Sequence, residues 1–147
     1  MGYFGALDIG ASALTAQRLR MDTISQNIAN ANTTRTENGT PYRRRLVVFE
    51  EKSQGTPFSE YLTNSSKERF TGKGVKVSKI AEDSSPFKRV YDPGNPDADT
   101  EGYVQMPNVD IITEMVNMIS ATRAYEANVT SINTTKSMAM KALEIGR

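Results

Sequence analysis

The residues best suited to chemistry lie in one acidic stretch, Asp97-Ala98-Asp99-Thr100-Glu101-Gly102. Carboxylates at alternate positions before a glycine open the helix-loop-helix type of calcium loop, in which they bind the cation. The twelfth position of such a loop carries a glutamate that supplies two oxygens, whereas this chain has Asn108 there. A calcium loop and a solvated acidic turn are both open interpretations. With Asp92 the stretch also offers paired carboxylates for acid–base chemistry, although no cleft is evident around them.

A second charged cluster, Arg43-Arg44-Arg45, precedes the apolar run from Leu46 to Phe49. Guanidinium groups bind phosphates well. The whole chain, however, has 18 Lys plus Arg against 17 Asp plus Glu, so no net positive field supports binding to nucleic acid. Pairing with acidic groups across a subunit contact, or plain solvation, is the favoured use of these arginines.

The chain has no histidine, no cysteine and no tryptophan. It therefore lacks the usual proton shuttle, the thiol nucleophile and the commonest zinc ligands. We expect no enzymatic activity, no cofactor and no metal site. The first residues show no basic-then-apolar signal, and nowhere do about 18 apolar residues follow one another. We expect neither the usual secretory signal nor a membrane-spanning segment.

Two ladders of mostly apolar residues occupy opposite ends of the chain. The first consists of Leu7, Leu14, Met21 and Ile28. The second steps by four and three residues through Ile111, Met115, Met118, Thr122, Tyr125, Val129, Ile132, Lys136, Ala139 and Leu143. A mean spacing near 3.5 residues places one seam of a helix against another helix. The ladders predict long helices over 6–31 and 110–145, which pack with each other, with neighbouring subunits, or with both.

Polar residues lie at the C-terminal end of the first predicted helix and at the N-terminal end of the second. Asn27, Asn30 and Asn32 crowd the end of the first one, where short amides cap a carbonyl or accept left-handed backbone angles. We expect Asn27 and Asn30 to cap it and to bond to neighbouring backbone, and a role as simple turn formers is the open alternative. At the start of the second helix, we expect Asp110 to serve as the N-cap or first-turn anion, with Glu114 adding a favourable charge.

The segment between the helices contains three short apolar runs that predict strands. They lie at 42–51, at Val75, Val77 and Ile80, and at Phe87, Val90 and Tyr91. Residues 52–74 are mostly polar and predict a mobile loop. The fold class is therefore α+β. The expected organisation is an N-terminal helix in 1–32, a β-rich middle in 33–109 and a C-terminal helix in 110–147.

Four motifs of this chain, together with its ending, resemble one family of proteins. The stretch SQNIANANT, residues 25–33, resembles the asparagine-rich signature of flagellar rod, hook and hook-associated proteins. The stretches 91–99, 102–110 and 123–128, with the ending 136–146, resemble the C-terminal half of proximal rod members of that family. The insertion 34–40 before Pro41-Tyr42 fits the same branch, and residues 52–73 match least.

The resemblance implies a structural subunit of the proximal rod of the bacterial flagellar basal body. Such a subunit transmits torque from the membrane ring to the distal rod, hook and filament. It leaves the cell through the flagellar type III export apparatus and then assembles through its terminal helices. Implied partners are other copies, the rod proteins FlgB, FlgF and FlgG, and the junction protein FliE, with the ring protein FliF a further candidate. No nucleic acid or small-molecule substrate is implied.

The seams and the asparagine motif together predict the residues of the assembly interface. They are Leu7, Leu14, Met21, Asn27, Ile28, Asn30, Asn32, Ile111, Met115, Met118, Tyr125, Asn128, Val129, Ile132 and Leu143. Two other functions remain open on the residues alone. A coiled-coil adaptor or secretion chaperone would form a small defined oligomer and bind a client. A small hydrolase built on the acidic turn would lose activity when Asp97 or Asp99 is replaced.

Overall fold

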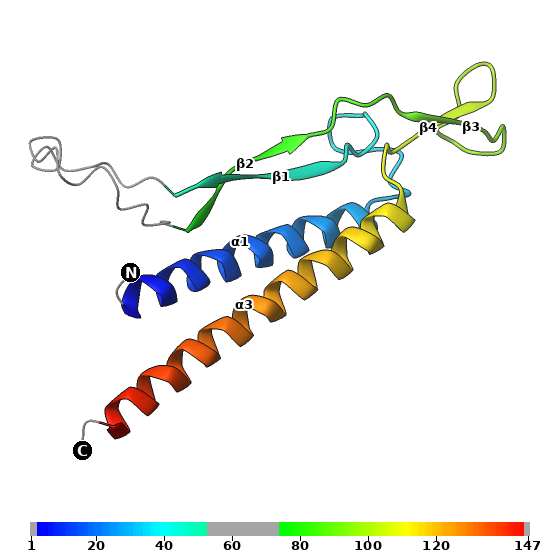
Figure 1. The fold of residues 1–147 in the computed structure, drawn as a ribbon. Helices are drawn as coiled ribbons and strands as arrows, with labels where there is room; N and C mark the ends of the chain where they lie inside the picture. The colour runs from blue at the N-terminus through cyan, green and yellow to red at the C-terminus, as the bar shows by residue number, and fades with distance from the viewer. Residues whose placement is uncertain (1–2, 53–73, 146–147) are drawn as a thin grey trace, which may run out of the picture.

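The computed structural model describes residues 3–52 and 74–145. Its elements in order are α1 (Tyr3–Ala29), β1 (Arg45–Glu51), β2 (Val75–Glu82), β3 (Lys88–Tyr91), β4 (Tyr103–Met106) and α3 (Ile111–Ile145). Two long helices at the ends of the chain lie side by side, with the strands of the middle segment along and beyond them (Figure 1). The predicted α+β fold is confirmed. The loop predicted at 52–74 falls, apart from its ends, outside the described residues.

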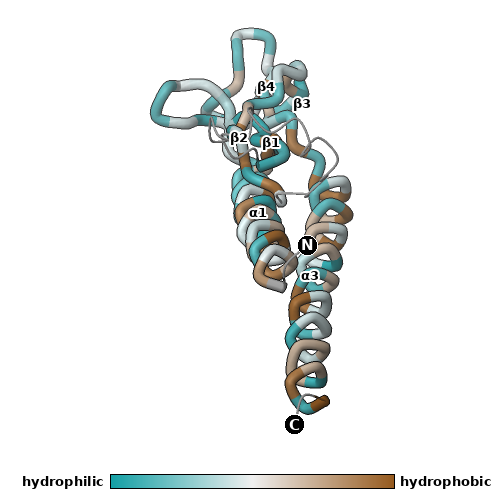
Figure 2. The backbone as a smooth tube through the Cα atoms, turned by 60° about the vertical axis from the view of Figure 1, so that its left-hand side comes forward, coloured by the Kyte–Doolittle hydropathy of each residue, from teal (hydrophilic) through white to brown (hydrophobic). Residues whose placement is uncertain are grey.

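Helices α1 and α3 run antiparallel along one another. Asn27 of α1 contacts Glu114 near the start of α3, Met21 contacts Thr122, and Gly10 faces Ile132. At about 1.5 Å per residue, the 35 residues of α3 reach about 52 Å, whereas the 27 residues of α1 reach about 40 Å. The end of α3 therefore continues past the start of α1, as Figure 2 shows. Neither described helix has the long apolar stretch that crossing a membrane requires.

The two helices approach each other closely at Gly10. A Cβ atom built on this glycine would lie 2.7 Å from Cγ1 of Ile132 and 3.0 Å from its Cδ1. We expect Gly10→Val to destabilise the helix pair by about 1–3 kcal/mol, because the stiff Ile132 side chain has to move. Thermal unfolding monitored by circular dichroism measures the change.

A matched control for this substitution is Gly5→Ala, since a Cβ at Gly5 meets no atom within 4 Å. Removing a helical glycine there is expected to leave stability unchanged or to raise it by up to about 1 kcal/mol. Equal melting temperatures for Gly10→Val and the unmodified chain would contradict the close packing at this position.

The described part of the middle segment forms two separate two-stranded antiparallel sheets, β1 with β2 and β3 with β4. The first expected strand, at 42–51, begins only at Arg45. Strand β4 was not predicted, because Tyr103–Met106 is short and follows directly on the acidic turn. Tyr91 and Tyr103 pair across β3 and β4 with ring centroids 5.3 Å apart.

The long hairpin of β1 and β2 is fixed to α1 at its far end. The hydroxyl of Ser12 accepts a hydrogen bond from the Val75 amide at 3.2 Å. Gly74 adopts a φ of +88°, and a Cβ there would lie 2.3 Å from the Ser12 hydroxyl. Only glycine combines this backbone angle with so close an approach. The hairpin therefore lies along α1 instead of projecting freely from it.

The ends of the helices agree in part with expectation. Asn30 caps α1, because its amide donates to the Gln26 carbonyl at 2.9 Å. Asp110 is the N-cap of α3, since its carboxylate accepts from the Thr113 hydroxyl at 2.5 Å and from amides of the first turn. None of the described asparagines adopts a left-handed backbone. The prediction that Asn27 caps α1 is wrong, because this side chain points to other elements.

Candidate assembly interface

A buried asparagine joins α1 to the rest of the molecule. Asn27 is 0% exposed. Its amide nitrogen donates to the Arg45 carbonyl at 2.8 Å and to Glu114 Oε2 at 2.9 Å. Its oxygen accepts from the Arg45 amide at 2.9 Å and from the Tyr42 hydroxyl at 3.0 Å. These four bonds use the full hydrogen-bonding capacity of the side chain.

The second centre of this arrangement is Glu114, which is 1% exposed. Its Oε1 accepts from Arg44 Nε at 2.9 Å and from Nη2 at 2.6 Å. A buried carboxylate is costly unless it is paired and its lone pairs are used, and here Arg44 and Asn27 do both. We expected Glu114 to add a favourable charge to the first turn of α3 and Arg44 to face outward. In the structure, the two side chains pair with each other inside the molecule.

Asn108 completes the arrangement from the segment before α3. Its side-chain oxygen accepts from the Arg44 amide at 2.9 Å, and its amide donates to the carbonyls of Asp83 and Ser85 at 3.1 and 3.2 Å. We call the set Asn27, Tyr42, Arg44, Asn108 and Glu114 the polar clamp. It ties both helices to the strands at one end of the molecule.

Burial raises the pKa of the Tyr42 hydroxyl, with Arg45 acting in the opposite direction. The clamp therefore keeps this hydroxyl protonated, as its hydrogen bond to Asn27 requires. At the edge of the clamp, hydrogen bonds from Ser85 lower the pKa of the Asp83 carboxyl. The carboxyl also lies 3.5 Å from Arg44 Nη1. Arg44 thus has a second, more exposed anionic partner.

Four carboxyl groups have a pKa lowered by hydrogen bonds in the fold: Glu50, Asp83, Asp99 and Asp110. A depressed pKa in the folded state means that protonation favours the unfolded chain. Their contribution is present above the ordinary values of 4.5 and 3.8 and is lost as the pH falls below them. We expect the melting temperature to fall between about pH 5 and pH 3.

Ser78→Ala provides the control for this pH dependence. The Ser78 hydroxyl donates to Glu50 at 2.7 Å and is the main cause of the lowered pKa of that carboxyl. The variant is expected to show a shallower loss of melting temperature over the same interval. A melting temperature that rises on acidification would contradict this account.

The acidic stretch folds as a turn that its own carboxylates hold. Asp99 Oδ1 accepts from the amides of Glu101 and Tyr103, both at 2.9 Å, and these bonds with the Arg89 charge lower its pKa. Asp97 accepts from the Thr34 hydroxyl at 2.7 Å. Among the described residues, no group of three or more acidic, histidine or cysteine side chains is arranged to hold a metal ion. The solvated-turn interpretation fits these contacts.

The outward surface of α3 carries exposed apolar side chains at its two ends. Near its start, Ile112, Met115, Val116 and Ile119 are 74%, 55%, 61% and 54% exposed. Their spacing of three and four residues places them on one face. We call these four residues the head patch. Contiguous exposed apolar surface of this kind marks interaction sites.

A second exposed set lies on the part of α3 that continues past α1. It consists of Met138, Met140, Leu143 and Ile145. At about 100° per residue, Met138 and Ile145 project from one side, and Met140 and Leu143 from the opposite side. We call these residues the tail patch. Brown hydrophobic segments are visible at this free end in Figure 2.

The structure divides the residues predicted for the interface into three groups. Asn27 is enclosed by the clamp, and Asn30 caps α1. Exposed to solvent are Asn32, Ile111, Met115 and Leu143. Half-buried are Leu7, Leu14, Met21, Ile28, Met118, Tyr125, Asn128, Val129 and Ile132. The role of these residues between subunits stays a prediction.

The face that α3 turns inward differs from the predicted ladder at its beginning. Glu114 and Ala121 are the buried residues of this helix, whereas Ile111 and Met115 are exposed. The clamp draws Glu114 inward, and the inward face follows from that position. Sequence reasoning missed Arg44 and Glu114 as a pair, because opposite charges 70 residues apart carry no pattern.

Two family models match the parts of the chain that form this arrangement. A model described as flagella basal body rod protein matches residues 7–35, which contain most of α1. The model of the C-terminal region of the flagellar basal body rod FlgEFG protein matches residues 100–145, which contain α3. The two long helices and the asparagine motif are thus those of a flagellar basal-body rod protein.

Full-length relatives narrow this class. The proteins described as flagellar basal-body rod protein FlgC in Bacillus subtilis (strain 168), Borreliella burgdorferi and Aquifex aeolicus (strain VF5) are 56%, 47% and 40% identical to this chain. The alignments cover 98% or more of this chain and 97% or more of each relative. The chain belongs to the FlgC family and is a structural protein of the flagellar basal-body rod, where it assembles with other rod components.

Proposed function

We propose that this protein is a subunit of the proximal rod and transmits torque from the membrane ring to the distal rod, hook and filament. The observation that carries the proposal is the apolar surface that α3 leaves exposed in the single chain. An isolated soluble protein rarely exposes this many large apolar side chains on one helix, and their burial against neighbours stabilises assembly. An axle has to resist twisting, and many such contacts distribute the shear.

In this proposal, residues 1–32 and 110–147 form the inner, assembling part of the subunit, and residues 33–109 lie outward. The polar clamp supports this division, because it fixes the strands to the helices through bonds that leave no buried donor of Asn27 unused. Proposed neighbours are other copies, FlgB, FlgF and FlgG, together with FliE and FliF. The chain reaches them through the type III export apparatus.

Electron microscopy of purified basal bodies tests this function. Deleting the gene is expected to give bodies that stop at the membrane ring. The intact chain should restore the rod, and a chain lacking residues 1–32 should not. Complete rods in the deletion strain would contradict the proposal and favour a coiled-coil adaptor, which is not required for the axle itself.

A further inference from the structure

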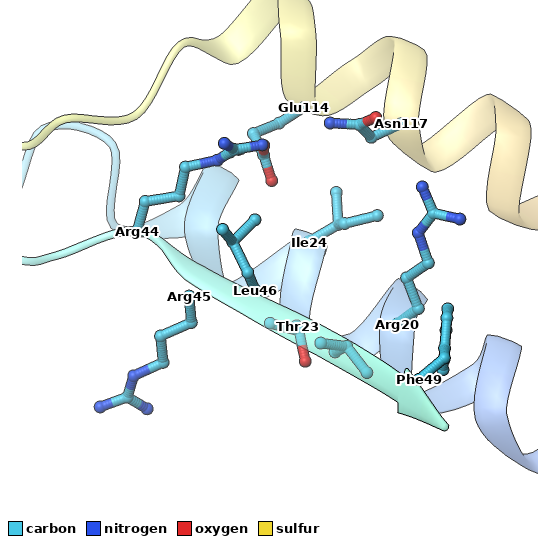
Figure 3. Close-up of a pocket in the computed structure, with 10 residues that line it drawn as sticks. Arg20, Thr23, Ile24, Arg44, Arg45, Leu46, Phe49, Glu114 and Asn117 are labelled. Carbon is cyan, nitrogen blue, oxygen red and sulfur yellow. Dashed lines mark hydrogen bonds and ion pairs between the residues drawn. The ribbon is translucent and has the colours of Figure 1, made fainter. Parts of the chain in front are cut away.

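A hollow lies between α1, α3 and the first hairpin, next to the polar clamp. Its volume is about 340 Å³, and its walls include Ile24 and Arg20 of α1, Leu46 and Phe49 of β1 and Asn117 of α3. Figure 3 shows these side chains around the space between the helices and β1. Its lining combines four apolar side chains with polar and charged ones from all three elements: Ile24, Leu46, Val47 and Phe49 with Arg20, Thr23, Arg44, Arg45, Glu114 and Asn117. We call this hollow the Arg20 pocket.

The pocket contains a cation, Arg20, for which the described residues supply no anionic partner. Arg44 and Glu114 satisfy each other at one end of the hollow. Arg20 is half-buried, and it makes no hydrogen bond or ion pair among the described residues. A partly desolvated guanidinium gains most from a carboxylate, which it binds through two N–H groups. The chemistry of the pocket therefore suits a carboxylate flanked by apolar side chains.

The end of α3 carries this combination. Leu143 and Ile145 are 77% and 84% exposed on either side of Glu144. Among the described residues, the carboxylate of Glu144 pairs with Lys141 alone, at 3.5 Å and with both side chains largely exposed. Such a surface pair contributes little. This segment lies beyond the start of α1, and its large apolar side chains are left largely exposed.

We propose that the end of α3 of one copy docks into the Arg20 pocket of a second copy, with Glu144 paired to Arg20. This inference rests on the assembly function proposed above and names one of its contacts. Leu143 and Ile145 then pack against the apolar walls formed by Leu46 and Phe49. The contact joins two different surfaces. After two copies dock, the pair therefore still has one unoccupied pocket and one free end of α3. Contacts of this type extend into open helical arrays.

Disulfide crosslinking tests the contact in assembled basal bodies. The chain has no cysteine, so Leu46→Cys with Leu143→Cys introduces the only two thiols of each copy. The two single-cysteine variants should give no dimer, which separates the expected 46–143 disulfide from 46–46 and 143–143 disulfides. Position 143 lies 26 residues beyond Asn117 in the same helix, a separation of about 39 Å. A disulfide requires Cα atoms within about 7 Å, so both cysteines of one chain cannot react together. We expect oxidation to give dimers and larger multimers of this chain.

Charge reversal provides the second part of the test. Arg20→Glu, added to the cysteine pair, is expected to lower the dimer yield at least about tenfold. Further addition of Glu144→Arg should restore it, because the pair is re-formed with opposite signs. A control pair, Leu46→Cys with Ser131→Cys, should give no dimer. Monomer alone, a product containing another protein, or a yield that charge reversal leaves unchanged would overturn the inference. If the rods in those samples were intact, the proposed function as a rod subunit would still hold.

Discussion

Replacing Glu114 by alanine is expected to lower the free energy of unfolding by about 3–5 kcal/mol, the largest change that a single substitution produces here. The substitution leaves the Arg44 guanidinium, whose side chain is 21% exposed, without its buried partner. It also leaves one amide hydrogen of Asn27 unused in the interior. Since a domain of this size is stable by about 5–15 kcal/mol, the variant should be close to unfolding at 37 °C. Chemical denaturation of the purified protein measures the difference.

Glu126→Ala is the matched control, because Glu126 is on the same helix and its side chain is exposed. Removing this carboxylate is expected to change stability by no more than about 0.5 kcal/mol. Equal losses for the two variants would mean that the clamp adds nothing beyond ordinary helix charge. Arg44 would then have to be satisfied by Asp83 alone, which lies 3.5 Å away.

The second large effect is expected at Val116, in the centre of the head patch. Val116→Asp should abolish swimming and rod assembly while leaving the melting temperature of the isolated chain within about 2 °C, because this side chain is exposed before assembly. A carboxylate buried without a partner costs at least about 3 kcal/mol per contact, which weakens association on the order of a hundredfold. Motility plates, electron microscopy and thermal unfolding measure the three quantities.

Ser131→Asp places the same charge on an exposed, polar position of α3. We expect near-normal swimming, because only an apolar contact excludes the carboxylate. Loss of assembly in both variants would contradict the assignment to the head patch and would indicate that α3 tolerates no added charge along its length. Normal swimming of Val116→Asp would remove the head patch from the interface.

The helices and the strands of the first hairpin could be predicted from the sequence because their signals are local. Apolar spacing over many residues predicted α1 and α3 to within three residues at each end, and Asp110 before an apolar run predicted an N-cap. Strand β4 escaped prediction because four residues carry too little alternation to distinguish a strand from a turn. Elements with a long apolar pattern could therefore be predicted, whereas a strand of four residues could not.

The polar clamp could not be predicted for a different reason. Its bonds join Asn27, Arg44 and Glu114, which lie in three separate elements. Each residue alone has an ordinary local explanation, as helix end, surface cation or first-turn anion. Only the antiparallel packing of α1 on α3 brings them together. The asparagine motif marked the right place, but the partners of Asn27 depend on the tertiary fold.

The separation of these partners along the chain has a consequence for the order of folding. The bond between Asn27 and Glu114 spans 87 residues of a 147-residue protein. Closing so long a loop is entropically costly and slows folding. A chain that emerges from a channel starting at either end cannot form this bond until most of its length is free. In the export that we propose, native structure is thereby delayed until nearly the whole polypeptide has left the channel, so the chain stays unfolded during its passage.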